Sequence, residues 1–414
     1  MQDVVAELEP HRFVDVDLAS EEVRQNFRRY LSEWAKRPPF YVMQNGSPQV
    51  VVSRFNDMKE VLSDRARFSS VPPPDRNPRL RKFMPNKFMR VTPPTQMEGP
   101  PHARIRRLAN PAFSDSAIDR LQPQVQAIID DLVETLRGQG PVFDAMHEFG
   151  SKLMPYVMLQ GLFGFSAEER DIFVRMNQSL KLTAQLSPED PFPADYVKAF
   201  DDAEEIIMKI ITRRRANPGD DIISQLVLAY DDGDTLSDTE LFDLIFTFGA
   251  GAIESTAATM GGALLTLCQH PDQFDRLKQN PALIPAALEE CMRYHGPGFL
   301  LFTRYAMVET QLGGTPLLAG MPIYVVNQAA SWDPKQYPDP LRFDIDRNPQ
   351  RVPVFGGGVH FCIGNRLARL VLRTGLETLV ANFPNLRLAN PDFKPVYGGA
   401  LSETQLVALP LRWD

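Results

Sequence analysis

The sequence predicts a mainly α-helical protein with a small β-sheet region. Apolar residues recur at helical spacing in four long stretches, 117–136, 199–215, 241–268 and 366–382. β-branched and aromatic residues gather instead at about 38–55 and 303–328, and in the C-terminal "ETQLVALPLRW". The 414 residues contain no obvious repeat, linker or low-complexity tract, so we expect one domain that spans residues 1–414.

The first β-rich stretch, "FYVMQNGSPQVVVSRF", places two strand-like runs around Asn45-Gly46. Asn-Gly favours the two-residue turn of a β-hairpin. The later segment 71–101 holds nine prolines and cannot form one helix. Its phenylalanines and methionines favour contact with something apolar. We interpret it as a lid over a pocket, with an ordinary surface loop as the alternative.

The stretch 244–268 has Glu254 as its only charge and is long and apolar enough to span a membrane. The alternative is a helix that is buried on all sides in a large globular protein. Aromatic belts and basic flanks are missing, and "SDTE" at 237–240 supplies the capping box of an ordinary helix. We therefore expect a buried helix over 239–268, about 45 Å long at 1.5 Å per residue.

Composition limits the classes of binding partner and the cellular compartment that we expect for this protein. The net charge of −8 argues against nucleic acid as a partner. Three cysteines (Cys268, Cys291 and Cys362) are too few for a disulfide framework and are typical of a reducing compartment. The N-terminal residues lack the basic and continuous apolar regions of a signal peptide. We expect a cytoplasmic protein that binds neither nucleic acid nor membrane.

Cys362 has a distinctive setting within "VFGGGVHFCIGNRLARLVL", residues 354–372. The three consecutive glycines before it allow positive φ and the close approach of a flat ligand. An amphipathic helix follows, so Cys362 lies at a helix N-terminus, where the dipole and free N–H groups stabilise a thiolate. Gly364 leaves room above the sulfur. The stretch offers no partner for a disulfide or a zinc site, so it indicates the chemistry of a single thiolate.

The pattern Phe355-Gly356-x-Gly358-x-His360-x-Cys362-x-Gly364 resembles the haem-binding loop of the cytochrome P-450 monooxygenases at every fixed position. The resemblance implies the cytochrome P-450 fold and a haem b whose iron is ligated by Cys362. It also places Phe355, His360 and Gly364 beside the haem. A thiolate ligand pushes electron density toward the iron and favours O–O cleavage.

Other landmarks of that family follow in the expected order. Glu290-x-x-Arg293 in "EECMRY" resembles its acid–arginine pair, whose members share a helix face because they lie one turn apart. "YPDPLRFDIDR" resembles the family's meander, with Arg347 as the third member of this network and Arg342 as the alternative. The resemblance gives these residues a structural rather than a catalytic role.

Haem propionates need cations when they are buried. "PPHARIRR" resembles the start of the family's haem-contacting helix and places His102 and Arg106 on one face. Arg304 in "FTRYA" and His360 complete the set that the resemblance implies. For each residue taken singly, a solvated surface position is the alternative interpretation.

"GAGAIEST" in the long helix resembles the oxygen-binding segment of the family. Gly251 and Ala252 would let this helix pass close to the haem, and glycine in a helix interior costs about 1 kcal/mol. Glu254 and Ser255 match the family's acid–alcohol pair, although threonine is usual at the second position. Thr256 is the alternative hydroxyl if the helix is locally unwound.

The resemblance implies insertion of one atom of O2 into a small apolar organic substrate, by hydroxylation, epoxidation or O-dealkylation. Electrons would come from a ferredoxin and its NAD(P)H-dependent ferredoxin reductase, since no flavin or Fe–S cysteine set is present. We expect a monomer, in which Arg366, Arg369 and Arg373 face either an acidic electron donor or solvent. A peroxide-driven peroxygenase and a non-catalytic haem sensor are the alternative functions.

By resemblance, seven apolar residues line the substrate pocket: Phe88, Met89, Phe173, Phe248, Leu300, Leu301 and Leu401. This set favours a terpenoid, aromatic or steroid-like substrate over a sugar or nucleotide. Six cations between 76 and 90 allow attraction of an anionic substrate, with a solvated loop as the alternative.

Overall fold

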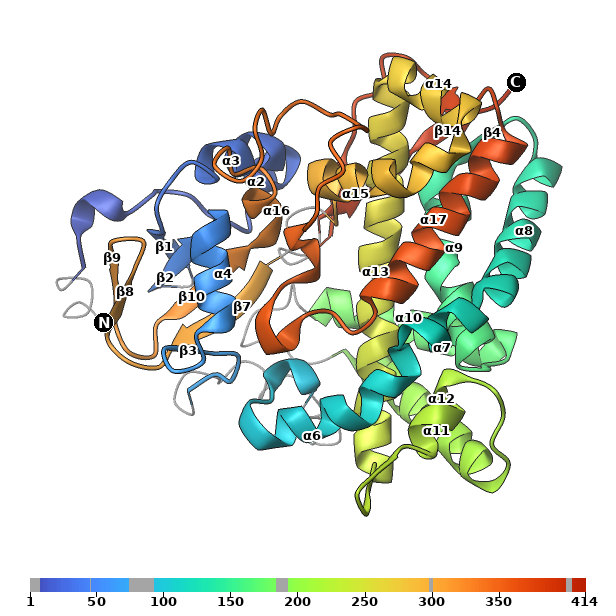
Figure 1. Ribbon diagram of the computed structural model, residues 1–414, viewed down its shortest axis with the longest axis horizontal. Helices are drawn as coiled ribbons and strands as arrows, with labels where there is room; N and C mark the ends of the chain where they lie inside the picture. Colours follow the sequence, from blue (N-terminus) through green and yellow to red (C-terminus); the bar gives the residue numbers. More distant parts are fainter. Residues whose placement is uncertain (1–7, 45, 74–92, 184–192, 298–300, 400–403) are drawn as a thin grey trace.

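The computed structural model describes residues 8–44, 46–73, 93–183, 193–297, 301–399 and 404–414. A large helical part lies beside a smaller region built around a β-sheet (Figure 1). The C-terminus of the chain lies on the helical part. Over the described residues, the mainly helical architecture with minor sheet confirms the predicted fold class.

The helices account for most of the described chain. Their bounds are α2 Glu21–Gln25, α3 Phe27–Trp34, α4 Phe55–Ser63, α6 Gly99–Ala109, α7 Asp115–Arg120, α8 Gln122–Gln139, α9 Ser151–Met154, α10 Ala167–Thr183, α11 Ala194–Ala216, α12 Ile222–Val227, α13 Asp238–Gln269, α14 Pro271–Gln279, α15 Ile284–His295, α16 Asn327–Ala330 and α17 Asn365–Asn382. Two segments beside α9, Ala145–Gly150 and Pro155–Leu162, are π-helical. Four single-turn 3₁₀ helices lie in connecting loops, at Pro94–Gln96, Asn110–Phe113, Pro353–Phe355 and Gly358–His360.

The strands are short. Their bounds are β1 Phe40–Gln44, β2 Ser47–Val52, β3 Phe68–Ser69, β4 Val142–Asp144, β5 Tyr230–Asp231, β6 Asp234–Thr235, β7 Leu301–Ala306, β8 Thr310–Leu312, β9 Thr315–Leu317, β10 Pro322–Val326, β11 Arg387–Leu388, β12 Tyr397–Gly398, β13 Gln405–Leu406 and β14 Pro410–Arg412. The main sheet has the order β1-β2-β10-β7-β3. Strands β1 and β2 pair antiparallel, with Phe40 opposite Val51, as the Asn-Gly turn predicts.

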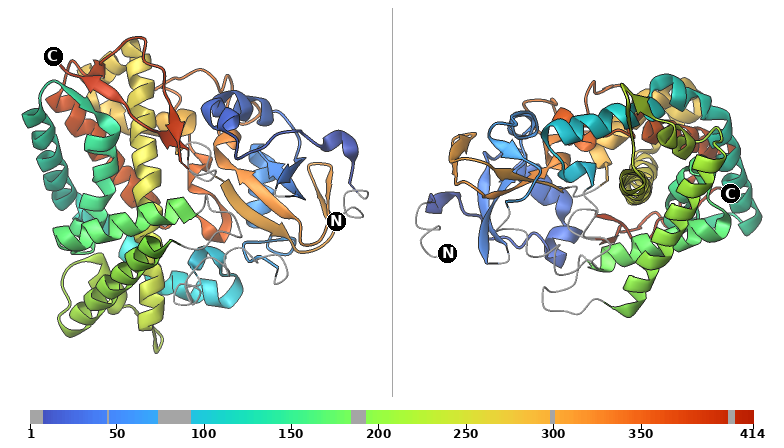
Figure 2. Two further views of the ribbon diagram at one scale, coloured as in Figure 1. Left: turned by 180° about the vertical axis from the view of Figure 1, so that it is seen from behind. Right: turned by 90° about the horizontal axis from the view of Figure 1, so that it is seen from below.

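Helix α13 is the central element of the helical part. Ser237 caps it by accepting a hydrogen bond from the Glu240 N–H while the Glu240 side chain returns one, so the predicted capping box is present. It packs against α9, α11, α15 and α17. The right-hand view of Figure 2 looks along the axis of α13. It is the one helix in the described chain that is long and apolar enough to cross a membrane, but 56% of its most apolar window is buried inside the protein. That burial agrees with a core helix.

One predicted helix is wrong in its extent. The stretch 117–136 forms two helices, α7 and α8, that meet at Leu121. Pro123 explains the break, because proline has no N–H to donate and is tolerated only in the first turn of a helix. The π-helical segments were not predicted, since a single extra residue per turn leaves no clear periodic signal in so short a stretch.

The cysteine-containing loop lies between the two parts of the molecule. In Figures 1 and 2 this orange-red loop runs between the sheet region and α13. Its start is held by the Asn327 side chain, which donates to the Pro353 carbonyl at 2.9 Å. Its middle, Gly358–His360, contacts α4. The fold therefore brings α4, α6, α13, β7 and the loop around one region.

Candidate active site

Glycine is required for different reasons at different positions of the cysteine loop. Gly358 has φ +63°, and a Cβ there would lie 1.9 Å from the Leu62 carbonyl oxygen at the end of α4. Gly356 has φ +72° and passes over the Phe302 ring. Gly357, by contrast, is extended at φ −171°, which any residue can adopt. Close approach to α4 and positive φ thus explain two of the three consecutive glycines.

Cys362 lies just before α17 and is tied into the loop by its backbone. Its N–H donates to the Phe355 carbonyl at 3.0 Å, and its own carbonyl accepts from the Asn365 side chain at 2.9 Å. The residue has an exposed surface, yet burial raises the pKa of its thiol. These two facts agree if the sulfur faces a space enclosed by protein rather than bulk solvent.

The electrostatics at Cys362 differ from the sequence-based expectation. Desolvation dominates and raises the pKa of the thiol, while the Gly364 N–H, Arg106 and Arg369 act in the opposite direction. The helix N-terminus therefore reduces the free-energy cost of ionising the thiol, but part of that cost remains. A bound metal cation would supply what is missing, because a coordinating thiol loses its proton.

Four predicted cation positions come together from three elements. His102 and Arg106 come from α6, Arg304 from β7 and His360 from the loop, and the rings of His102 and His360 are 4.4 Å apart. Burial lowers the pKa of Arg304, Arg106 and His360, and lowers that of His102 to about 4. Among the residues that the structure describes, neither arginine forms an ion pair. In the described part of the chain, the buried Arg304 and the half-buried Arg106 are thus left without a carboxylate partner.

Glu98, at the N-cap of α6, is a member of this cluster that sequence reasoning missed. Its Oε1 lies 3.3 Å from the His360 Nε2 and accepts from the Ser70 N–H and hydroxyl at 2.9 Å each. An acid just before a helix is an ordinary start signal, so nothing in the sequence singles it out. Its partners are distant in the chain and only the fold brings them together.

On α13, the predicted oxygen-activation residues lie on two faces. Gly251 is exposed, and a Cβ there would meet nothing within 4 Å. Ser255, one turn later, keeps accessible surface and donates to the Gly251 carbonyl at 3.0 Å. Ala252 is half-buried. Thr256 is buried, and α13 is a continuous α-helix through this stretch, so the local unwinding that would favour Thr256 over Ser255 is not observed.

Glu254 lies on the other face of α13. Its carboxylate accepts from the Asn177 amide at 3.1 Å and from the Gln405 amide at 2.9 Å. With Ile253 and Ala257 it lines a cavity of about 490 Å³ whose wall also includes π-helical residues. The side chain is 9% exposed. Glu254 therefore lies between this cavity and the face of α13 that carries Ser255.

Gly249 has a different role from Gly251. A Cβ at Gly249 would lie 2.6 Å from the Phe173 ring. Phe173 is fully buried and packs against Phe165 and Phe246. We therefore correct the interpretation of Phe173 as a pocket residue, because its ring fills the core beside α13.

The remaining pocket residues are placed only in part. Phe248 is half-buried and meets Phe113 edge-on, with ring centroids 5.0 Å apart. Leu301 begins β7. The proline-rich lid itself falls mostly outside the described residues, and so do Phe88, Met89, Leu300 and Leu401.

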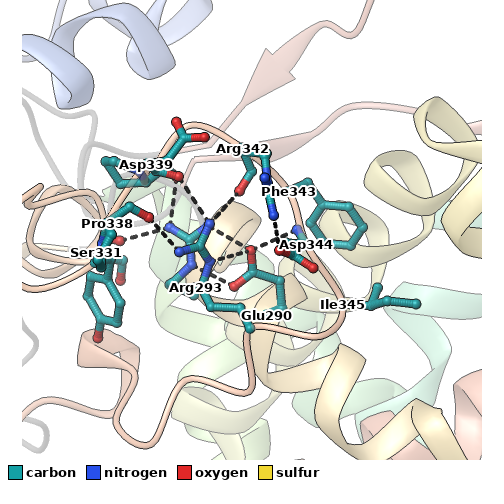
Figure 3. A network of polar contacts seen from close by, with 12 residues as sticks. Glu290, Arg293, Ser331, Pro338, Asp339, Arg342, Phe343, Asp344 and Ile345 are labelled. Atoms are coloured by element: carbon teal, nitrogen blue, oxygen red, sulfur yellow. Dashed lines mark hydrogen bonds and ion pairs between the residues drawn. The ribbon is translucent and has the colours of Figure 1, made fainter.

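A buried polar network is centred on Glu290 and Arg293 (Figure 3). Arg293 donates to both Glu290 oxygens, at 2.6 and 2.8 Å, and Arg347 donates to Glu290 at 3.1 Å. Arg342 pairs with Asp344 near the surface, so Arg347 is the third member. Backbone carbonyls take up the other donors of Arg293, namely those of Ser331, Pro340 and Arg342.

The arginines that follow Cys362 already have partners. Arg366 pairs with Asp115, Arg369 with Glu289 at 2.6 Å, and Arg373 donates to Gln122 at 2.9 Å. The guanidinium of Arg369 also covers the Phe355 ring, 4.3 Å from its centroid. The expected positive patch is thus interleaved with acids, because α7 and α15 bring carboxylates to this face.

Comparison with known proteins decides the family. The model of the family described as "Cytochrome P450" matches residues 16–397. The chain belongs to the cytochrome P450 family. It is 32% identical to the mycinamicin IV hydroxylase/epoxidase of Micromonospora griseorubida, with 91% of each chain covered. It is 29% identical to the 6-deoxyerythronolide B hydroxylase of Saccharopolyspora erythraea, with coverage of 96% and 98%.

A solved structure agrees with this assignment. The cytochrome P450 PksS of Bacillus subtilis 168 matches with a TM-score of 0.85 and 26% identity, over 96% of this chain and 100% of that one. The cytochrome P450 fold is therefore shared. The chain is an oxidoreductase of the monooxygenase type, and membership of this family implies a haem–thiolate cofactor.

The residues present fit such a cofactor. Cys362 offers a thiol that is accessible but enclosed by protein. Gly251 and Gly364 both border open space, since a Cβ at either would meet nothing within 4 Å. The half-buried Arg106 and the buried Arg304 lack carboxylate partners in the described chain, which matches the need of two propionates for cations.

Proposed function

We propose that this cytochrome P450 binds haem b through Cys362 and inserts one atom of O2 into an apolar organic substrate. The proposal is carried by the enclosed, accessible thiol of Cys362, which lies beside Arg106 and Arg304, two arginines without a carboxylate partner among the described residues. When bound, the haem–thiolate supplies the oxygen chemistry, because an electron-rich thiolate ligand favours O–O cleavage. Everything else is done by side chains of this chain.

The first task is to hold the cofactor's carboxylates. Arg106 and Arg304 provide charge from α6 and β7, and His102 and His360 provide imidazole N–H donors from α6 and the loop. Charge-assisted hydrogen bonds of this kind are about twice as strong as neutral ones. Phe355, fixed under Arg369, and Gly364 complete the contacts near the thiolate.

The second task is to deliver protons. Glu254 borders the 490 Å³ cavity, whose walls include polar side chains such as Asn177 and Gln405 that can hold water. Ser255 is the next residue and lies on the accessible face with Gly251. We assign Glu254 as the group that takes protons from the cavity side and Ser255 as the hydroxyl that passes them on.

The substrate is apolar and of substantial size. The half-buried Phe248 favours such a molecule, and relatives of this chain are named for mycinamicin IV and 6-deoxyerythronolide B. We propose that a ferredoxin, reduced by an NAD(P)H-dependent reductase, supplies electrons at the face of Arg366, Arg369 and Arg373. On this face acids alternate with arginines. Recognition of the ferredoxin therefore depends on its shape as well as on how its charges align with those of this face. The protein acts as a cytoplasmic monomer.

The test is the spectrum of the reduced protein with carbon monoxide. We expect the red-shifted Soret band of a thiolate-ligated haem, and its loss in Cys362→Ala. Cys268→Ala is the matched control, because burial raises the pKa of that thiol to about 12 and keeps it protonated. A normal band in Cys362→Ala would overturn the ligand assignment. Turnover with hydrogen peroxide alone, but not with a ferredoxin system, would identify a peroxygenase instead.

A further inference from the structure

Arg104 joins α6 to two elements that follow 130 to 136 residues later in the chain. Its guanidinium binds both carboxylate oxygens of Asp234, one through Nε and the other through Nη2 at 2.8 Å. Nη2 also donates to the Thr235 carbonyl at 2.9 Å, and Nη1 donates to Glu240 in the first turn of α13. Arg104 therefore connects α6 both to the β5–β6 hairpin and to the start of α13.

Glu240 uses its two oxygens for two different contacts. Oε2 accepts from the N–H and the hydroxyl of Ser237, at 2.9 and 3.0 Å, which completes the capping box of α13. Oε1 accepts from Arg104. Burial would raise the pKa of Glu240, but hydrogen bonds from Ser237 and Arg104 outweigh it and lower that pKa. The carboxylate is therefore ionised at neutral pH, and its charge ties the N-terminus of α13 to α6.

Arg104 and Arg106 lie on opposite faces of α6. Residues two apart in an α-helix are separated by about 200° around its axis. Burial raises the pKa of the Cys362 thiol and Arg106 acts against it, so Arg106 is on the side of α6 that faces the sulfur. Arg106 is half-buried, and no carboxylate of the described chain pairs with it. The position of Arg106 therefore depends on how α6 itself is held.

We propose that Arg104 is a positioning residue, which anchors α6 to α13 and so holds Arg106 in place for a haem carboxylate. The inference rests on the proposed function, in which Arg106 binds a propionate. A desolvated cation without a partner favours movement of its helix toward water. The ion pairs on the outer face of α6 oppose that movement. Loss of Arg104 therefore weakens the hold on the haem while the ligand bond to Cys362 stays intact.

The experiment is a double-mutant cycle on the rate of haem loss. Ferric holoprotein is mixed with excess apomyoglobin, and transfer of haem is followed by absorbance in the wild type, Arg104→Gln, Arg106→Gln and the double variant. We expect haem loss to be about fivefold faster in Arg104→Gln, as for a network of partly exposed ion pairs. In the Arg106→Gln background the same change has little further effect, because Arg104 acts through Arg106.

Three further measurements separate anchoring by charge from a general loss of structure. Arg104→Lys keeps the charge and restores most of the haem retention that Arg104→Gln loses. Glu240→Gln keeps the capping box, since glutamine also serves at that position, but it removes the charge that faces Arg104 and speeds haem loss. In about 1 M NaCl, where the screening length is about 3 Å, the difference between the wild type and Arg104→Gln shrinks.

Arg107→Gln is the matched control. Arg107 also lies outside the buried face of α6 and pairs with Asp231 of the hairpin, but this ion pair does not reach α13. Its loss leaves the rate of haem loss nearly unchanged. An effect of Arg107→Gln as large as that of Arg104→Gln overturns the positioning role, and so does a full effect of Arg104→Gln in the Arg106→Gln background. If the reduced wild type with carbon monoxide shows no thiolate spectrum, the proposed function itself fails before any variant is compared.

Discussion

Glu290 and Arg293 form an ion pair in which neither side chain has accessible surface, with Nε of Arg293 2.6 Å from the carboxylate. Arg293 reaches past the pair to the carbonyls of Ser331 and Pro340, and its own carbonyl accepts from Gln328 at 2.7 Å. The neighbouring Asn327 holds the Pro353 carbonyl where the cysteine loop begins. The pair on α15 is thus linked through α16 to the loop that carries Cys362.

Removal of Arg293 should therefore destabilise the protein strongly. Arg293→Ala leaves Glu290 buried without its main partner, and breaking such a pair costs about 3–5 kcal/mol. We expect the midpoint of urea unfolding, followed by far-UV circular dichroism, to fall accordingly. Arg342→Ala is the matched control, because Arg342 is exposed and its side chain pairs with the surface residue Asp344 rather than with Glu290. Equal midpoints for the two variants would contradict a supporting role for the buried pair.

The loop glycines allow a sharper comparison. Gly358→Ala adds a Cβ 1.9 Å from the Leu62 carbonyl at φ +63°, so the loop must move away from α4. Gly357→Ala adds one 3.4 Å from a Leu62 methyl in extended backbone, which is ordinary contact. We expect a large fall in bound haem per protein for Gly358→Ala and little change for Gly357→Ala. The ratio of Soret to protein absorbance measures both.

Burial of His295 makes stability depend on pH. Burial, and the nearby Arg28, lower the pKa of His295 to about 3, from an ordinary value of about 6.5. Below pH 6.5 the unfolded chain binds a proton at His295 that the folded chain does not bind. The free energy of unfolding therefore falls as pH falls toward 3, by up to about 1.4 kcal/mol per pH unit. His295→Gln should flatten that slope in urea unfolding measured from pH 7 to pH 4. An unchanged slope would show that other groups dominate.

Much of the site was predictable because its signals are local. The spacing around Cys362, the capping box of α13 and the Asn-Gly hairpin each lie within a few residues. Glu98, Asn177 and Gln405 were missed because their importance comes from partners 77 to 262 residues away. Phe173 was assigned to the pocket for a related reason. The sequence pattern of an aromatic residue at helical spacing is the same whether its side chain faces a pocket or the core. Pro123, a local signal that could have been used, divides α7 from α8.

The hydroxyl that passes protons can be identified by coupling. Ser255 keeps accessible surface beside Gly251, whereas Thr256 is buried in an unbroken helix. We expect Ser255→Ala to divert NADH consumption to hydrogen peroxide, with product formation slowed by about 10²-fold, as for loss of a proton-relay group. Thr256→Ala should keep product and NADH matched. The opposite result would move the relay to Thr256 and require local unwinding of α13.

The two amides that hold Glu254 provide the last prediction. Asn177 on α10 and Gln405 on β13 fix the carboxylate between the cavity and α13. Asn177→Leu removes one of these bonds, so the carboxylate is less often aligned with Ser255, and we expect product per NADH to fall by about tenfold, less than the loss for Glu254→Gln. Gln178→Leu is the matched control, because Gln178 lines the same cavity without a hydrogen bond to Glu254. If both leucine variants behave alike, cavity polarity rather than alignment of Glu254 governs proton delivery. A larger solvent deuterium isotope effect in Asn177→Leu alone would support alignment, since proton transfer would then limit turnover.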